Sequence, residues 1–307
     1  MAHLVEVSFI ALMLSSTYIL IAVGFTLFFG AIGIVHFAHG DVAMLGAFLG
    51  IIFYSLAEVA GLTAAMPLWV WGPLVMLATI LTTGALGLFF ERAVIRPFRK
   101  SPMLITLVAT VALGILVRES VRLFYPNGSN PQIFPKLFSM SDISLGVLHF
   151  RTGHLIIAGL SVLLILAMIL LIRHTRIGLA IRAVSQNVEA ASLSGINPDA
   201  VILITFLIGS MLAGVAGILI GSYYSVVKYD VGLMYGIKGF SAAVVGGLGN
   251  FYGAILGGLV LGMVETFASA FVPNGTAYKD VYAFVIVIFF LVFKPSGILA
   301  ERQYEKV

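Results

Sequence analysis

The chain has 307 residues, of which 61% are hydrophobic and 10% are charged, with a mean hydropathy of +1.12. Because soluble domains carry about 25% charged residues, this composition excludes a single soluble core and predicts an integral membrane protein. The net charge of +4 does not indicate nucleic-acid binding, since the first Lys or Arg is Arg92, and the absence of Cys excludes disulfides and thiolate chemistry. At about 20 residues per span, we expect an all-α, polytopic bundle of about eight to ten spans.

Apolar runs of the length of a bilayer predict plain spans, in chain order, at residues 8–30, 66–90, 103–124, 154–172, 201–221 and 278–293. The first run lacks a basic leader and is too long for a signal peptide, so we interpret it as a span. Between the spans, residues 91–102 hold four basic residues and one acid, which by the positive-inside rule makes this loop cytoplasmic. The loops at residues 125–151 and 222–236 are then external.

Residues 30–50 do not form a plain span, because they hold five glycines together with His36, His39 and Asp41. Glycine-rich polar backbone at membrane depth is tolerated where it is buried in protein or lines a cavity. We therefore predict a broken helix, with a new helix that begins near Gly40. Asp41 would cap this helix, where its negative charge suits the helix dipole.

A polar segment at residues 173–198 interrupts the chain just past its middle. Its arginines place it on the cytoplasmic side, two spans after the first basic loop. We predict a short amphipathic helix at residues 186–194, stopped by Gly195 and Pro198. A compact helix held there by spans at both ends suits contact with another protein, and a mere connecting loop is the alternative.

Residues 238–267 resemble the first broken stretch, since each has a glycine-rich break with an aromatic residue, His36-Phe37 in the first and Asn250-Phe251 in the second. Interrupted segments at matching places in two halves are typical of transporters with inverted repeats. We therefore predict one transmembrane domain, divided into repeat 1 (residues 8–172), the cytoplasmic loop (173–198), repeat 2 (199–294) and a C-terminal tail (295–307).

The side of each terminus depends on how the broken stretches cross. Both termini are external if each stretch crosses once, and cytoplasmic if each adds a re-entrant or short extra crossing. We prefer the second solution, because Arg302 and Lys306 make the tail weakly basic.

The two breaks are the candidate lining of a translocation pathway, since a hydrophobic solute needs a small and mostly apolar passage. The candidate residues are His36, Phe37, His39, Gly40, Asp41, Gly247, Gly249, Asn250 and Phe251. The two histidines would share a helix face, but no third metal ligand is evident, so we expect no metal site and favour buried histidines that hold the break. Asn250 is a candidate cap for the second helix.

Glu265 lies inside an apolar run. An ionisable residue in a span indicates a possible intramembrane functional site. Because Glu265 is near the end of its span, a side chain that reaches the membrane interface is the alternative.

Glu189, Ala190, Ala191 and Gly195 form the pattern E-A-A-x3-G. It resembles the coupling-loop motif of ABC importer permeases, in which a short cytoplasmic helix docks into a groove of the ATPase subunit. Around it, nearly the whole chain resembles the branched-chain amino acid ABC permeases of LivH type. The matching stretches are GFTLFFGAIGIVHFAHG (24–40), RPFRKSP (96–102), TRIGLAIRAVSQNVEAASLSGI (175–196), KGFSAAVVGGLGNFYGAILGG (238–258) and FKPSGIL (293–299). The chain departs from the family at His36, where Asn is usual.

The resemblance implies a bacterial inner-membrane permease subunit that moves branched-chain or other hydrophobic amino acids by alternating access. Its implied partners are a second, related permease, two cytoplasmic ATPases that bind ATP and Mg²⁺, and a periplasmic substrate-binding protein. It also implies that Arg182 and the E-A-A-x3-G residues couple the chain to the ATPases. The sequence agrees, because residues 232–238 come nearest to a P-loop and have the wrong spacing. We therefore expect no cofactor and no catalytic residues in this chain.

Four alternatives remain open at this point. A urea or short-amide ABC permease would share the family pattern with a different solute. An ion-coupled secondary transporter would use Asp41 or Glu265 for coupling. A membrane-embedded enzyme would need a nucleophile or metal set near His36 and His39, and a passive channel could not transport uphill.

Overall fold

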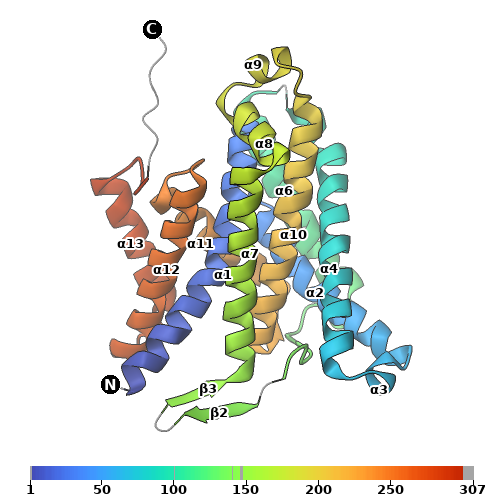
Figure 1. Cartoon of the computed structure of the whole chain (residues 1–307), viewed down its shortest axis with the longest axis vertical. Coiled ribbons are helices and arrows are strands. Elements are labelled where there is room, and N and C mark those ends of the chain that lie inside the picture. Colours follow the sequence, from blue (N-terminus) through green and yellow to red (C-terminus); the bar gives the residue numbers. More distant parts are fainter. Residues whose placement is uncertain (1, 100, 140, 146–147, 300–307) are drawn as a thin grey trace.

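The computed structural model describes residues 2–99, 101–139, 141–145 and 148–299, and it is a bundle of α-helices (Figure 1). The helices are α1 (Ala2–Ile32), α2 (His39–Val59), α3 (Leu62–Ala65), α4 (Leu68–Phe90), the π-helix η1 (Glu91–Ile95), α5 (Arg96–Phe98), α6 (Met103–Phe124), α7 (Thr152–His174), α8 (Arg176–Gln186), α9 (Val188–Leu193), α10 (Pro198–Tyr224), α11 (Val231–Gly246), α12 (Phe251–Phe271) and α13 (Lys279–Phe293). Short antiparallel strands pair β1 (Gln132–Ile133) with β4 (Val226–Val227), and β2 (Asp142–Leu145) with β3 (Leu148–Arg151). The predicted polytopic all-α bundle is confirmed.

Seven helical segments of the described chain are long and apolar enough to cross a membrane. They are His3–Ile32, His39–Val59, Leu68–Phe98, Met103–Phe124, Thr152–His174, Pro198–Tyr224 and Phe251–Phe271. α11 is apolar but has 16 residues, and α13 has 15. The estimate of eight to ten spans is therefore met only if at least one of these two shorter helices also crosses.

α1 is the central helix of the bundle. In the most apolar 18-residue stretch of α1, 78% of the residues are buried, against 22% in the corresponding stretch of α7. α1 contacts α7, α10, α11 and α12. Glycines bring α12 close to it: a Cβ added to Gly258 would lie 2.7 Å from Ile19 Cγ1, and one added to Gly262 would lie 2.5 Å from Ser15 Cα. Close approach of helix backbones through small residues is a main source of helix association in membranes.

The loop predicted at residues 91–102 is wrong for residues 91–98, because the structure is helical there. α4 continues through the π-helical turn η1 and through α5. Glu91 is buried at this turn, and its carboxylate pairs with Arg99. This local ion pair satisfies the buried carboxylate within the helical segment, which sequence periodicity alone does not reveal.

The short helix predicted at residues 186–194 is confirmed as α9, and a second helix that was not predicted, α8, precedes it across Asn187. α8 ends just before this residue, and the Asn187 side chain then caps α9 by accepting a hydrogen bond from the N–H of Ala190 at 3.0 Å. Gly195 ends the segment as predicted, with a φ of +82°. Pro198 does not stop a helix but begins α10, where the missing N–H has no helical partner to lose.

The N-terminus lies at the end of the bundle opposite α8 and α9 (Figure 1). The expectation that both termini share the side of these helices was therefore wrong for the N-terminus. The first break turns the chain back into the bundle, so that His39 lies against Gly24 of α1 and no extra crossing is added. Arg302 and Lys306, on which the expectation for the tail was based, lie outside the described residues.

Candidate functional site

The first break (residues 33–38) places two histidines against aromatic rings of α1. His36 and His39 are buried, and their ring centroids lie 5.0 and 5.1 Å from that of Phe28. His39 Nε2 lies 3.2 Å from the carbonyl oxygen of Ile21. This contact joins the start of α2 to the middle of α1. It agrees with the prediction that a buried histidine holds the break.

Within the described ranges of the chain, the same histidines have no third metal ligand beside them. Among the residues that the structure describes, no group of three or more His, Cys, Asp or Glu side chains is placed to hold an ion. The Nδ1 atoms of His36 and His39 also find no hydrogen-bond partner in the described part of the chain. The rings of His36 and His39 lie against aromatic side chains. That either histidine lines a translocation pathway stays a prediction.

Asp41 forms a buried ion pair that the sequence analysis did not predict. Its carboxylate oxygens lie 3.1 Å from Nε and 3.2 Å from Nη2 of Arg118, which comes from α6. α2 has no side-chain cap, so the predicted capping role of Asp41 was wrong: both of its oxygens face the guanidinium instead. The pair joins α2 to α6 immediately beside the first break.

Gly40 brings α11 to the same place. A Cβ on this residue would collide with the backbone of Gly232 and Gly236 in α11. A Cβ on Gly232 would in turn meet Asp41. Glycine at these positions therefore allows α2 and α11 to touch at the level of the ion pair.

The second break (residues 247–250) separates α11 from α12. The Asn250 side chain accepts a hydrogen bond from the N–H of Gly253 at 2.9 Å, so its predicted capping role is confirmed. Gly247 and Gly249 have φ values of +112° and +90°, a region that favours glycine. The local sequence thus explains both the stop of α11 and the start of α12.

The chain after α13 covers this second break. The N–H of Ile298 donates to the carbonyl oxygen of Val245, and the N–H of Leu299 donates to that of Gly246, each at 2.9 Å. Gly297 lies against Gly247, so that a side chain there would strike its backbone. The FKPSGIL stretch is therefore a structural part of the second break.

The predicted pathway residues form two groups that both contact α1 and α11. At the first break, the ring of Phe37 lies 5.5 Å from that of Phe240 in α11. At the second, Gly249 faces Phe29 near the end of α1. Phe251 is partly buried and its ring lies beside Tyr252 of the same helix.

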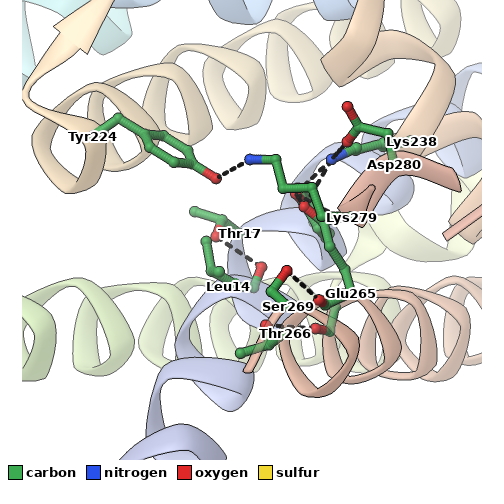
Figure 2. A network of polar contacts seen from close by, with 11 residues as sticks. Leu14, Thr17, Tyr224, Lys238, Glu265, Thr266, Ser269, Lys279 and Asp280 are labelled. Carbon is green, nitrogen blue, oxygen red and sulfur yellow. Dashed lines mark hydrogen bonds and ion pairs between the residues drawn. The ribbon is translucent and has the colours of Figure 1, made fainter. Parts of the chain in front are cut away.

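A charged network lies between α1, α11, α12 and α13 (Figure 2). Lys238 Nζ lies 2.8 Å from Glu265 Oε1 and 2.6 Å from Asp280 Oδ1. The Tyr18 hydroxyl donates to Glu265 Oε2 at 3.0 Å, and Lys238 donates to Tyr18 at 3.3 Å. The side chains of Lys238 and Glu265 are 6% and 3% exposed, so Glu265 does not reach an interface.

Figure 2 also shows how the network extends toward α10, because Lys279 donates to the Tyr224 hydroxyl at 3.3 Å. Sequence analysis missed Lys238 as the partner of Glu265, and Asp280 as the second carboxylate that Lys238 contacts. The available signal was Lys238 itself, a lone basic residue in an apolar stretch, since charges at membrane depth pair with one another.

The α8–α9 segment stands at the end of the bundle (Figure 1). The guanidinium of Arg182 donates to the carbonyl oxygen of Ile172, which fixes α8 to the end of α7. Ala191 is buried, whereas Glu189 and Ala190 are exposed together with Gly195. The predicted coupling residues therefore divide into an inner pair that anchors the segment and an outer set that other molecules can reach.

Leu193 adds an apolar contact to that outer set, with 91% of its surface exposed. Exposed apolar side chains at both ends of α9, Leu193 and Val188, are suited to contact with another protein.

Residues 8–291 match the family described as the permease component of branched-chain amino acid transport systems. The chain is 37% identical over 298 residues to the high-affinity branched-chain amino acid transport system permease protein LivH of Salmonella typhimurium, which covers 96% of this chain and 94% of that protein. It is 36% identical over 303 residues to the corresponding permease protein BraD of Pseudomonas aeruginosa, with 96% and 95% of the two chains covered. LivH of Escherichia coli is also 36% identical, over 298 residues, covering 96% of this chain and 94% of that protein. No solved structure matches the chain.

Proposed function

Because this chain belongs to the family of permease components of branched-chain amino acid transport systems, we propose that it is the permease subunit of an ABC importer for branched-chain or similar hydrophobic amino acids. It is a multi-pass protein of the bacterial inner membrane. As a permease it moves its solute without chemical change. The observation that supports the solute class is the similarity to LivH and BraD over 96% of the chain.

In this proposal the energy comes from two separate ATPase subunits in the cytoplasm, which hold ATP and Mg²⁺. A second, related permease completes the passage as a heterodimer partner, and a periplasmic binding protein delivers the amino acid. The exposed α9 tip supports an ATPase partner, because it offers Leu193 and Glu189 on a helix that is anchored at both ends.

Movement of the ATPases would enter the chain at α9. Glu189, Ala190 and Gly195 form the contact surface, while Arg182 and Ala191 keep the segment attached to the bundle. α10 begins shortly after this segment and packs along α1, α2 and α4. A displacement of α9 therefore has a direct mechanical route through α10 to the start of α2, where the first break lies.

The solute would pass next to the two breaks. Both contact α1 and α11, and Phe37 and Phe251 give them an apolar character that suits a branched aliphatic side chain. Alternating access then requires the first group (residues 36–41) and the second group (residues 247–251) to move relative to each other. Glycines at both breaks give the backbone the freedom that such a movement needs.

The test is transport by purified components. The chain is first extracted in mild detergent and the proteins that co-purify are identified, which should return a second permease and two P-loop ATPases. Liposomes with the whole complex and its binding protein should then accumulate radiolabelled leucine only when ATP is supplied.

Each other outcome names a different transporter. Uptake driven by a proton or sodium gradient without ATP would replace the proposal with an ion-coupled transporter that uses Asp41 or Glu265. ATP-driven uptake of urea or a short amide, but not of leucine, would keep the ABC mechanism and change the solute. Movement that only follows the concentration gradient would indicate a channel.

A further inference from the structure

A small cavity with charged walls lies where the extension of α4 meets the first turn of α10. Arg92, Arg96 and Arg99 line it from the α4 side together with Glu91, and Asp199 lines it from α10. Three arginines against two carboxylates leave these walls with a formal net charge of +1. The transport proposal assigns no role to this cavity.

Ion pairs occupy only part of this positive charge. Arg99 is held between Asp199, at 2.8 Å, and Glu91, and its side chain is only 15% exposed. Arg96 contacts Asp199 at 3.0 Å but keeps 56% of its side chain exposed. Arg92 is exposed and makes no hydrogen bond or ion pair within the described part of the chain. Guanidinium groups are therefore available for an anion at the outer edge of the cavity.

The cavity also lies at the surface of the membrane region. The residues that line it from the α4 side lie at the end of the candidate span Leu68–Phe98. Figure 1 shows that α4 ends at the same end of the bundle as α9. Phe89 and Phe98 belong to the same end of this helical segment and are 61% and 37% exposed, which gives that end exposed apolar side chains. A basic cavity between transmembrane helices on the cytoplasmic side is the setting in which acidic lipid head groups bind.

We propose that this cavity binds the phosphate of an anionic phospholipid of the inner leaflet. Arg92 and the exposed edge of Arg96 contact the phosphate oxygens, a geometry for which the planar guanidinium is better suited than lysine. The acyl chains lie along the apolar surface that includes Phe89. Because Asp199 belongs to the first turn of α10, the bound lipid adds to the contact that joins α4 to the helix entering from α9.

The experiment measures retained lipid on the purified full chain. Native lipid is first removed from the protein in a neutral detergent. The protein is then titrated with anionic phosphatidylglycerol or, separately, with zwitterionic phosphatidylcholine, and the bound lipid is counted by native mass spectrometry. Arg92→Gln removes no ion pair, so its folding is not at risk, and Arg92→Gln with Arg96→Gln removes both exposed guanidinium groups. The matched control is Arg173→Gln with Arg176→Gln, which removes two exposed arginines at the same end of the bundle but away from the cavity.

We expect phosphatidylglycerol to bind more tightly than phosphatidylcholine, and Arg92→Gln to weaken it about fivefold, the usual effect of one basic residue at an anionic leaflet. The double variant should lose roughly 25-fold by the same rule, while the control pair keeps its affinity. Equal retention by the double variant and the wild type, or an equal loss in the control pair, would overturn the proposal. Displacement of phosphatidylglycerol by low-millimolar inorganic phosphate would assign the cavity to the free ion instead of the lipid.

Discussion

Lys238 lies beside two carboxylates at once, the buried Glu265 and the partly exposed Asp280, and its own side chain is only 6% exposed. Lys238→Met removes this cation and leaves the buried Glu265 with the Tyr18 hydroxyl as its remaining side-chain partner among the described residues. Breaking one side of a buried pair typically costs ~3–5 kcal/mol, because the other charge stays buried. We therefore expect the free energy of unfolding to fall by ~3–5 kcal/mol in this variant.

The two acidic partners should rank below Lys238. Glu265→Gln should cost ~1–3 kcal/mol, because Lys238 keeps Asp280 at 2.6 Å while one buried hydrogen-bonded charge is lost. Asp280→Asn should cost ~0–1 kcal/mol, since its side chain is 37% exposed and solvent screens the pair. Combining Lys238→Met with Glu265→Gln should recover part of the loss, because the uncompensated charge at Glu265 is then removed.

The assay is reversible unfolding in mixed micelles, with added dodecyl sulfate as denaturant and circular dichroism as the readout. Lys279→Met is the matched control, since Lys279 is a neighbouring lysine that is only partly buried and hydrogen-bonds to Tyr224. It should change the free energy of unfolding by ~1 kcal/mol or less. A Lys238→Met protein within ~1 kcal/mol of the wild type, or a control that loses as much, would refute the view that the network holds α1, α11, α12 and α13 together.

Five further variants test three other parts of the structure. Glu189→Lys, and separately Gly195→Val, should leave membrane insertion and ATP hydrolysis by the complex intact but abolish most ATP-driven leucine uptake; normal uptake by both would exclude α9 as the coupling surface. Arg118→Met should lower the free energy of unfolding by ~3–5 kcal/mol and Arg118→Met with Asp41→Asn by clearly less, measured in the same micelles, whereas equal losses would mean that Asp41 is not charged against Arg118. Gly262→Val should cost at least ~1–3 kcal/mol by overpacking the contact between α1 and α12, and an unchanged melting curve would show that these helices can separate there.

Local patterns predicted a large part of this architecture. Hydropathy located the long helices, and the glycine-rich stretches located both breaks, with α2 beginning at His39 and α12 at Phe251. Asn250 could be recognised as a cap because its hydrogen bond goes to a residue three positions along the chain. All of these features depend on neighbours within about one helix length, so the sequence contains the information they need.

The failures share a different cause. The helix continues through residues 91–98, where the buried Glu91 pairs with Arg99, and the carboxylate of Asp41 faces Arg118 from another helix instead of capping α2. From the sequence alone, a charged residue could pair with several others. The helix propensity of the surrounding residues does not show which of them is its partner. Packing also decided the N-terminal side, since the first break turns back against α1 and does not add a crossing.

The sequence by itself determined that the chain is a helical membrane protein of this permease family, where its two glycine-rich breaks lie, and which polar residues lie in apolar surroundings. Only the tertiary structure decided which of those polar residues meet. Asp41 and Arg118 are 77 positions apart, and Lys238 and Glu265 are 27 apart. The physical reason is that a buried charge is tolerated only beside an opposite charge, and which charge is beside it depends on how the helices pack in space.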